Sequence, residues 1–379
     1  MIMKKVLSIL LSRFLYGKER SNIEVYNLLY DSGEYDVRVV TSDDADERLY
    51  LLLSKFSLYR IPIIDRHDKT HSRLSYFYSL IDSNIKLYNI ISEYKPDILF
   101  VNSELSIYDL YPSLMFFRGK IVYRIGDAPA YPNLRFKIYN TYIWQHFVVN
   151  RVDSMVFISE YIKNAVKLTG RDRNTDLVIY NYPPNRKVTH KEKIVKFQNV
   201  ITFGYIGQVI EIKGVAHFVE AAKKLLVQYE NVHFVIAGSL SYDSVFAQKI
   251  VEMCGNDEHF TLLGEINDVE SFFGSIDVLC VPSIKQEPLG NVIVEAKKYS
   301  KPCIIYPSGG MPELISHLHD GYICSSQNVD SLLDGMLYYI SDFNKIALHS
   351  IEAKLSVDRL GIDRKSFEKK WFYIFECLQ

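Results

Sequence analysis

The sequence predicts an α/β protein made of two doubly wound domains, each a parallel sheet covered by helices. Short apolar runs rich in Val, Ile and Leu alternate with amphipathic stretches, and this alternation stops once and then restarts. Apolar runs without polar alternation are typical of strands buried on both faces, and hence of parallel sheets. The length of 379 residues agrees with about two domains.

The first half alternates six predicted strands with four predicted helices. The strands cover residues 6–11, 37–41, 97–101, 121–125, 154–158 and 177–180, and the helices cover 19–32, 74–95, 134–150 and 159–168. Residues 181–198 then break the rhythm, because they contain Pro183, Pro184 and several Lys and Arg but few apolar side chains. We interpret this stretch as an interdomain linker.

The alternation restarts after the linker and predicts a second domain. Its strands cover residues 200–206, 232–237, 260–263, 278–281 and 303–306, and its helices cover 214–229, 244–255, 289–299 and 328–340. Residues 366–378 form an aromatic-rich helix that we expect to pack on the first domain. The predicted division is therefore 1–185, 186–362 and 363–379. Ligands of doubly wound sheets bind at the carboxyl ends of the strands, so we expect the site in a cleft between the domains.

The charge balance excludes one function class and suggests a location. A total of 44 Lys and Arg against 45 Asp and Glu gives a net charge of -1, which argues against a protein that coats nucleic acid. Residues 1–188 carry 26 Lys and Arg and 21 Asp and Glu (+5), and the remainder carries 18 and 24 (-6). A positive first domain would suit an anionic, lipid-linked substrate, so we expect a cytoplasmic protein with peripheral contact to an anionic membrane.

The cysteines and the first residues of the chain bear on the cellular compartment that we expect. All five cysteines lie in the second half without a C-x-x-C, which disfavours a disulfide framework or a structural zinc site and fits a reducing cytosol. The start imitates a signal peptide, but its apolar run from Val6 to Leu11 is short and Arg13 interrupts it, so we predict a buried strand. No run of about 18 apolar residues predicts a membrane span.

Residues 282–296 carry the most informative motif. A loop follows a predicted strand, Glu287 precedes the next helix, and Glu295 lies on that helix. Gly290 suits a helix start where the backbone approaches a ligand closely. The N–H groups and the dipole at such a start attract a phosphate. The two carboxylates would accept hydrogen bonds from hydroxyls, as on a ribose or a hexose.

In this context Glu287-x7-Glu295 resembles the signature of retaining glycosyltransferases of the GT-B fold, specifically glycosyltransferase family 4 (group 1). The resemblance covers nearly the whole chain and implies two Rossmann-like domains facing a central cleft. Other landmarks follow the family's order at predicted βα junctions; they are Lys18-Glu-Arg20, Lys95-Pro-Asp97, 156–160, 178–181, Gly207-x5-Lys213-Gly214, Ala237-Gly238, Leu263-Gly264, Pro282-Ser283 and 309–313.

The resemblance implies a donor site in the second domain. Lys213 would neutralise the donor's diphosphate, whose charge grows as it departs. Glu295 would hold the ribose hydroxyls, and Glu287 would position the sugar and stabilise a developing oxocarbenium charge. The base would rest near Leu263, Gly264 and Glu265. The other donor-binding positions are Gly207, Gln208 and Gly238 in the loops and Leu289, Gly290 and Asn291 at the helix start.

The resemblance also implies an acceptor side and an independence from metals. Gly17, Lys18 and Arg20 would lie on the acceptor side, and Asp127 would contact the sugar or acceptor as a third catalytic residue beside Glu287 and Lys213. No cofactor or divalent metal is expected, because lysine and helix dipole neutralise the diphosphate.

The chain departs from the family pattern at three places. Gln208 stands where the family usually has Arg, a single Gly17 stands where paired glycines are usual, and Gly126 replaces a His before Asp127. These departures leave open a second function, a non-catalytic subunit that binds a nucleotide sugar. Structural roles also stay open: the glutamates and Lys213 as surface groups at helix starts, Arg20 on an exposed face, and Asp127 as a turn cap.

Two other sequence patterns indicate structural rather than functional roles. His317-x-His319-Asp320 lies in a loop without further ligands, so we do not interpret it as a metal site. Residues 134–147 combine aromatics with Arg135 and Lys137, which favours a packed helix over a membrane interface.

The leading prediction is a retaining glycosyltransferase of bacterial surface polysaccharide or lipopolysaccharide assembly. A nicotinamide-dependent oxidoreductase is disfavoured because no G-x-G-x-x-G follows the first strand. G-x-S-x-G and P-loop motifs are likewise absent, which disfavours a hydrolase or an NTPase.

Overall fold

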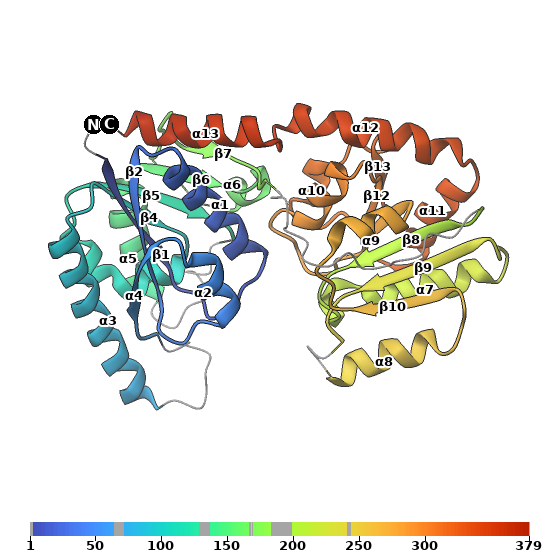
Figure 1. The fold of residues 1–379 in the computed structure, drawn as a ribbon, viewed down its shortest axis with the longest axis horizontal. Coiled ribbons are helices and arrows are strands. Elements are labelled where there is room, and N and C mark those ends of the chain that lie inside the picture. Colours follow the sequence, from blue (N-terminus) through green and yellow to red (C-terminus); the bar gives the residue numbers. More distant parts are fainter. Residues whose placement is uncertain are drawn as a thin grey trace. The chain divides into compact units, whose positions relative to one another are not determined.

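The computed structural model describes residues 3–63, 72–128, 137–166, 168, 170–182, 199–240 and 244–378. The chain divides into an N-terminal unit, Met1–Tyr180 with Phe367–Gln379, and a C-terminal unit, Asn181–Ser366 (Figure 1). Each unit contains one parallel sheet with helices around it, so the predicted class is confirmed. Most of the predicted linker, residues 183–198, lies outside the described residues.

The sheet of the N-terminal unit has seven parallel strands in the order β3-β2-β1-β4-β5-β6-β7. The chain runs outward from β1 to β3 and then returns to β4 on the other side of β1. The sheet therefore has a switch point between β1 and β4, where loops diverge and ligands of such sheets bind. The strands are β1 (Lys4–Leu10), β2 (Tyr35–Ser42), β3 (Ser57–Ile61), β4 (Ile98–Val101), β5 (Lys120–Ile125), β6 (Ser154–Phe157) and β7 (Leu177–Val178).

The helices of the N-terminal unit include one long helix, α3. Ser72 caps its start, where its side chain accepts a hydrogen bond from the Ser75 amide at 3.1 Å. The helix predicted over 134–150 corresponds to α5 and a following π-helical stretch, η2, whereas 134–136 lie outside the described residues. The helices are α1 (Gly17–Asp31), α2 (Glu47–Leu53), α3 (Arg73–Tyr94), α4 (Glu104–Leu114), α5 (Lys137–Ile143), η2 (Trp144–Val149) and α6 (Glu160–Ala165).

The sheet of the C-terminal unit repeats this plan with six parallel strands in the order β10-β9-β8-β11-β12-β13. Its switch point lies between β8 and β11. Residues that follow these two strands are thus brought to the same edge of the sheet although they are far apart in the chain. The strands are β8 (Ile201–Ile206), β9 (Val232–Ala237), β10 (Phe260–Gly264), β11 (Val278–Val281), β12 (Cys303–Ile305) and β13 (Gly321–Ile323).

The last helix of the chain joins the N-terminal unit from Phe367 onward. The Trp371 ring lies 5.4 Å from the ring of Phe100 on β4, and Phe375 lies 5.6 Å from Tyr35 on β2. The other helices belong to the C-terminal unit; they are η3 (Glu211–Lys213), α7 (Val215–Leu226), α8 (Ser244–Cys254), α9 (Val269–Ser275), α10 (Asn291–Lys298), η4 (Met311–Leu314), α11 (Val329–Ile340) and α12 (Asn344–Leu360), and the last helix itself is α13 (Arg364–Cys377).

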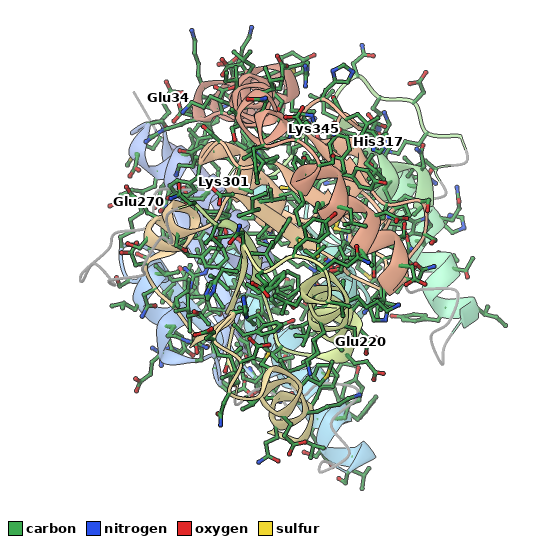
Figure 2. All side chains as sticks on the ribbon, turned by 90° about the vertical axis from the view of Figure 1, so that its right-hand side faces the viewer. Glu34, Glu220, Glu270, Lys301, His317 and Lys345 are labelled. Atoms are coloured by element: carbon green, nitrogen blue, oxygen red, sulfur yellow. The ribbon has the colours of Figure 1, made fainter. Side chains whose placement is uncertain are left out.

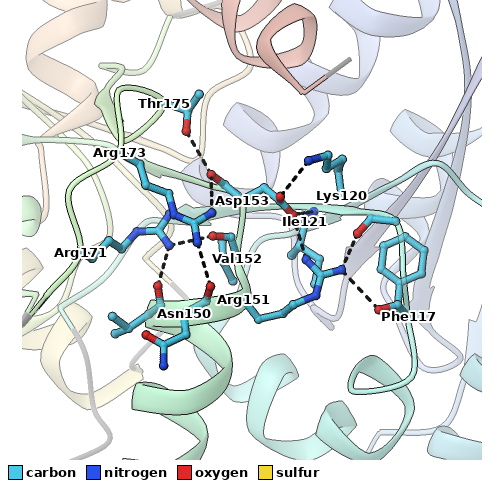
Figure 3. A network of polar contacts seen from close by, with 12 residues as sticks. Phe117, Lys120, Ile121, Asn150, Arg151, Val152, Asp153, Arg171, Arg173 and Thr175 are labelled. Atoms are coloured by element: carbon cyan, nitrogen blue, oxygen red, sulfur yellow. Dashed lines mark hydrogen bonds and ion pairs between the residues drawn. The ribbon is translucent and has the colours of Figure 1, made fainter.

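A network of hydrogen bonds rich in arginine links β5, the start of β6 and the loop before β7 (Figure 3). One carboxylate oxygen of Asp153 accepts a hydrogen bond from the Ile121 amide at 2.9 Å and one from Arg151 at 3.0 Å. The Asp153 backbone carbonyl accepts from Thr175 at 3.0 Å and from Arg173 at 3.3 Å. The start of β5 is thereby tied to the loop before β7, and β5 carries Asp127 at its other end.

Several short or polar elements were not predicted. Strand β3 lies at the edge of its sheet and is only partly buried, so it lacks the uninterrupted apolar run that identifies a buried strand. The buried face of helix α12 consists of His349, Ala353 and Ser356 rather than large apolar side chains, and β13 has only three residues. No helix in the described ranges combines the length and apolar character needed to cross a bilayer.

Candidate functional site

Lys213 and Glu287 meet at the switch point of the C-terminal sheet. Lys213 ends η3, just after β8, and Glu287 lies in the loop after β11; β8 and β11 are paired neighbours. The Lys213 Nζ atom lies 2.5 Å from Glu287 Oε1. The lysine side chain is 29% exposed and the glutamate 16%, so a ligand can reach the pair from one side. The topology therefore brings together two of the three residues predicted to be catalytic.

The loops that carry this pair are bonded backbone to backbone. The Ile212 carbonyl accepts hydrogen bonds from the amides of Ile284 at 2.9 Å and Lys285 at 3.2 Å. Gly214 has φ +71°, and a Cβ atom there would lie 1.9 Å from the Pro282 carbonyl oxygen. Only glycine permits this approach, so the Lys-Gly sequence fixes where the lysine stands.

A second loop holds the backbone of Glu287. The Gly310 amide donates to the Glu287 carbonyl at 2.8 Å, and the Glu287 amide donates to Ser308 Oγ at 3.3 Å. Gly309 has φ +57°, and a Cβ atom there would lie 2.0 Å from the same carbonyl oxygen. Gly309 and Gly310 thus position the loop that carries Glu287. Sequence reasoning did not assign this role to them.

Tyr205 is a site residue that sequence reasoning missed. Its side chain is buried on β8, and its hydroxyl donates to the Gln208 carbonyl at 2.7 Å. Burial and then the negative charge of Glu287 raise the pKa of Tyr205, so the hydroxyl keeps its proton and remains a donor. The hydrogen bond anchors the loop that carries Gly207 and Gln208.

Three of the predicted donor-binding glycines lie in a row at the ends of adjacent strands. Gly207 follows β8 and donates to the Ala237 carbonyl at 3.0 Å, and Gly238 follows β9 and donates to Gly264 at 2.8 Å. A Cβ atom on Gly238 would lie 2.0 Å from the Gly207 carbonyl oxygen. By contrast, nothing lies within 4 Å of a Cβ built on Gly264, beside the half-buried Leu263. All three glycines are partly exposed, and without side chains they let a ligand approach their backbone.

Helix α10 presents its N-terminus next in the chain. Gly290 caps it with φ +93°, and Leu289 is buried, so this residue supports the helix start from within. Asn291 starts the helix and its side-chain oxygen accepts from Asn181 at 2.5 Å. The first N–H groups of a helix have no partner within it, and its dipole favours an anion. Glu295 lies half-buried further along α10.

A buried ion pair holds α10 from behind. Lys297 Nζ donates to Asp320 Oδ2 at 2.8 Å and to Ser356 Oγ of α12 at 2.8 Å, and neither charged side chain is more than 1% exposed. Arg359 also reaches Asp320, at 3.2 Å.

His317, labelled in Figure 2, accepts a hydrogen bond from the Ile323 amide at 2.9 Å. Asp320, which belongs to the His-x-His-Asp pattern, is therefore an internal ion-pair partner, and sequence reasoning did not anticipate this.

The N-terminal unit pairs two of its predicted residues. Lys18, in the first turn of α1, lies 2.6 Å from Asp127, which follows β5; the two side chains are 36% and 62% exposed. A Cβ atom on Gly126 would lie 3.4 Å from Lys18 Cε, so a histidine at this position would crowd the lysine. Gly17 is exposed, whereas Arg20 is half-buried and donates from its amide to the Tyr16 carbonyl at 3.2 Å.

The same edge of the N-terminal sheet carries a groove of about 430 Å³ that was not predicted. Arg13 lies on one wall, 2.6 Å from Asp44, and donates to the Ile63 carbonyl at 3.2 Å. Sequence reasoning treated Arg13 only as an interruption of the first apolar run. The lining comes from the loops after β1, β2 and β3 and from α3; it consists of Arg13, Asp43, Asp44, Pro62, Ile63, Ser75, Tyr78, Ser79 and Asp82.

Comparison with known families identifies the larger part of the C-terminal unit. Residues 186–352 match the family model of Glycosyl transferases group 1. The C-terminal unit is a group 1 glycosyl transferase domain. This match covers Lys213, Glu287 and Glu295, and it confirms the resemblance of this segment to group 1 glycosyl transferases.

Comparisons over nearly the whole chain also find glycosyltransferases and proteins of the same fold. An uncharacterized glycosyltransferase of Haemophilus influenzae is 22% identical over 350 residues, 92% of this chain and 93% of the relative. A glycosyltransferase structure from Rickettsia africae matches with a TM-score of 0.80 at 17% identity, covering 99% and 98% of the two chains. The HepE structure of Anabaena with UDP-glucose matches with a TM-score of 0.75 at 18% identity, covering 98% and 99%. The chain thus has the GT-B fold of two Rossmann-like domains, and the group 1 glycosyl transferase match lies in its C-terminal unit.

Proposed function

We propose that this glycosyltransferase moves a sugar from a nucleotide-diphosphate donor to a saccharide or lipid-linked saccharide acceptor, with retention of configuration. The observation that carries the proposal is the Lys213–Glu287 pair beside the glycine row and the N-terminus of α10. Together these groups offer a lysine cation, helix amides and a carboxylate, which are the groups that a diphosphate and a sugar need.

The proposed reaction proceeds on one face of the sugar. The bond between the anomeric carbon and the diphosphate oxygen breaks, and the acceptor hydroxyl oxygen bonds to the same face of that carbon. The departing phosphate oxygen takes the hydroxyl proton. Lys213 and the α10 amides would stabilise the leaving diphosphate, and Glu287 would stabilise positive charge on the sugar. Glu295 would hold the ribose hydroxyls.

Charge neutralisation by Lys213 and α10 would make a divalent metal unnecessary. We therefore expect transfer to persist when EDTA is present throughout purification and assay. A complete loss of transfer in EDTA that Mg²⁺ or Mn²⁺ restores would contradict this part of the proposal.

The acceptor side is assigned to the Lys18–Asp127 pair of the N-terminal unit. Its exposed carboxylate can accept hydrogen bonds from sugar hydroxyls. We expect Asp127→Asn to raise the KM for the acceptor while slow hydrolysis of the donor keeps its rate. Equal losses in both reactions would remove Asp127 from the acceptor side. The biological setting, surface polysaccharide or lipopolysaccharide assembly with work at the inner face of the membrane, rests on the family resemblance.

The first experiment is a thermal-shift screen across UDP-, GDP-, ADP- and dTDP-sugars, because a ligand that binds only the folded chain raises its Tm. UDP-glucose is the first donor to test, since the Anabaena structure of the same fold contains it. The donor that binds is then used in transfer assays with Lys213→Ala and Glu295→Ala, and NMR of the product reports its anomeric configuration. Full transfer activity in both variants would refute the proposed site.

One observation favours a second candidate, a subunit that binds a nucleotide sugar without transferring it. Gln208 removes a positive charge usual in this family, and its loop is held by Tyr205 through the backbone alone. In that case a donor would raise the Tm, but neither transfer nor hydrolysis would be measured with any acceptor.

A further inference from the structure

Helix α3 is apolar on two opposite faces. Leu87, Ile90 and Tyr94 lie on the face that is buried within the N-terminal unit. The opposite face carries six large apolar or aromatic side chains that are exposed to between 43% and 69%; these are Leu74, Phe77, Tyr78, Ile81, Ile85 and Tyr88. A surface helix normally turns one apolar stripe to the core and a polar face to solvent, so the second apolar face of α3 indicates a surface that another molecule covers.

The six exposed residues form one continuous strip, here called the α3 strip. Each of them has another of the six three or four residues away, which places the set within a sector of roughly 100° around the helix axis. At the Tyr88 end the strip continues onto the turn after α4, because the Tyr88 and Phe116 rings lie 6.4 Å apart. Phe116 and its neighbour Met115 are 60% and 47% exposed. Scattered exposed apolar residues are ordinary, but a contiguous patch marks a binding surface.

Positive charge accompanies the strip. Exposed Lys95 directly follows α3, and exposed Arg118 follows Phe116 by two residues, while exposed Glu93 and Asp97 offset part of this charge. The Lys120 amide donates to the Asp97 carbonyl at 2.9 Å, which joins the segments after α3 and α4 side by side. Residues 1–188 as a whole carry a charge of +5. The apolar strip thus lies on the cationic part of the chain.

We propose that the α3 strip docks on an anionic lipid bilayer. Lying flat, the 22-residue helix would place its aliphatic side chains among the acyl chains and its tyrosine hydroxyls at the headgroups. Lys95 and Arg118 would contact the anionic headgroups. This inference deepens the proposed function, on which it rests for a lipid-linked acceptor, and it assigns the surface that brings the N-terminal unit to that acceptor. A second copy fits less well, because two cationic units would repel one another.

The chain offers a matched control for this proposal. Leu348, Ile351 and Leu355 form a similar strip on α12 in the C-terminal unit, with exposed fractions of 61%, 59% and 56%. Residues 189–379 carry a charge of -6, so an anionic bilayer should not attract this second strip. Both strips can lose three apolar side chains without touching any residue of the proposed active site.

The experiment is co-sedimentation of the full chain with vesicles at low salt. The vesicles consist of phosphatidylcholine alone or of phosphatidylcholine with phosphatidylglycerol. The wild type is compared with Phe77→Ser/Ile81→Ser/Ile85→Ser on α3, with Tyr88→Ser/Phe116→Ser at the end of the strip, and with Leu348→Ser/Ile351→Ser/Leu355→Ser on α12. Thermal unfolding verifies that each variant is folded, and the rate of donor hydrolysis in solution is measured for each.

We expect the wild type and the α12 variant to bind anionic vesicles equally, and the α3 triple variant to lose at least about tenfold in partitioning. The pair at the strip's end should lose less, and hydrolysis should be unchanged in all variants. Three results would overturn the proposal: no preference of the wild type for anionic vesicles, equal losses in the α3 and α12 variants, or a dimer that only the α3 changes dissociate. Absence of hydrolysis in the wild type would instead count against the proposed function, since vesicle binding is measured separately.

Discussion

Lys213 and Glu287 are 74 positions apart in the chain, yet their side chains form an ion pair of 2.5 Å at the junction of β8 and β11. The pair is partly exposed, and each partner has a separate proposed task. A bound diphosphate would compete with Glu287 for Lys213. The Glu287 carboxylate, once freed from the lysine, could then contact the sugar. The two tasks can be separated by substitution.

Replacing Glu287 by Gln should leave binding of the donor's nucleoside diphosphate intact or tighten it, because the carboxylate no longer competes for Lys213. Transfer should fall by about a hundredfold, since a neutral amide stabilises positive charge on the sugar poorly. Lys213→Met should instead weaken diphosphate binding by about tenfold or more, as expected for a lost hydrogen bond to a charged group. Isothermal titration with UDP and a transfer assay measure both. Equal weakening of UDP binding by the two substitutions would contradict the separation.

Gly309→Ala should cut donor binding although residue 309 is proposed to touch no ligand. The new Cβ atom would lie 2.0 Å from the Glu287 carbonyl oxygen, so the Glu287 loop must shift. Gly33→Ala is the matched control, because Gly33 has a similar φ of +71° and nothing within 4 Å of a Cβ. Gly33→Ala should lose about 1 kcal/mol of stability to the left-handed backbone, and Gly309→Ala should lose more because the contact with the Glu287 backbone adds to this cost. The donor-induced rise in Tm should disappear in Gly309→Ala alone; its persistence there would show that the contact does not position Glu287.

Lys297→Met should destabilise the C-terminal unit by about 3–5 kcal/mol, because it leaves Asp320 charged and buried without its lysine. Lys224→Met tests whether burial is the cause. Lys224 pairs with Asp330 at 2.5 Å, but these side chains are 51% and 77% exposed, so the change should cost less than about 1 kcal/mol. Urea unfolding of both variants measures the difference. Similar small losses would mean that Lys297 is compensated by relaxation or solvent.

His233 should make the stability depend on pH in mildly acidic solution. Burial and then the nearby His259 lower the pKa of His233 to about 4, and its Nε2 atom lies 2.8 Å from Thr261 Oγ1. Between pH 6.5 and 4 the unfolded chain binds a proton that the folded chain does not, so the free energy of unfolding falls as the pH falls through this window. The contribution is about 2 kcal/mol at pH 5 relative to pH 7.5.

His233→Gln removes this proton uptake. Its free energy of unfolding in urea should decline less between pH 7.5 and pH 5 than that of the wild type. His259→Gln, which alters a partly exposed side chain, should retain most of the wild-type dependence. If the free energy of unfolding of His233→Gln declined as much as that of the wild type, another group would be responsible for the acid sensitivity.

The elements that could be predicted are those with a strong local pattern. Central strands such as β4 and β11 are uninterrupted apolar runs because helices cover both faces of the sheet. Edge strand β3 is half-exposed, and its mixed residues resemble a loop. The spacing of Glu287 and Glu295 could be recognised in the sequence because both residues lie in one local segment, a loop and the helix α10 that follows it. Tyr205 gave no such signal, since a tyrosine on a buried strand looks like core until its partner is known.

By itself, the sequence determined the α/β class, the repeat of two doubly wound units, and the residue types gathered at the donor loops, because strand burial and helix starts depend on neighbours within a few positions. Only the tertiary structure decided which distant residues meet. The strand order places β8 beside β11, and so joins Lys213 to Glu287; folding of α10 against α12 buries Lys297 with Asp320. The outer face of α3 was also decided at this level, because periodicity shows that a helix has two apolar faces but not which one the sheet covers.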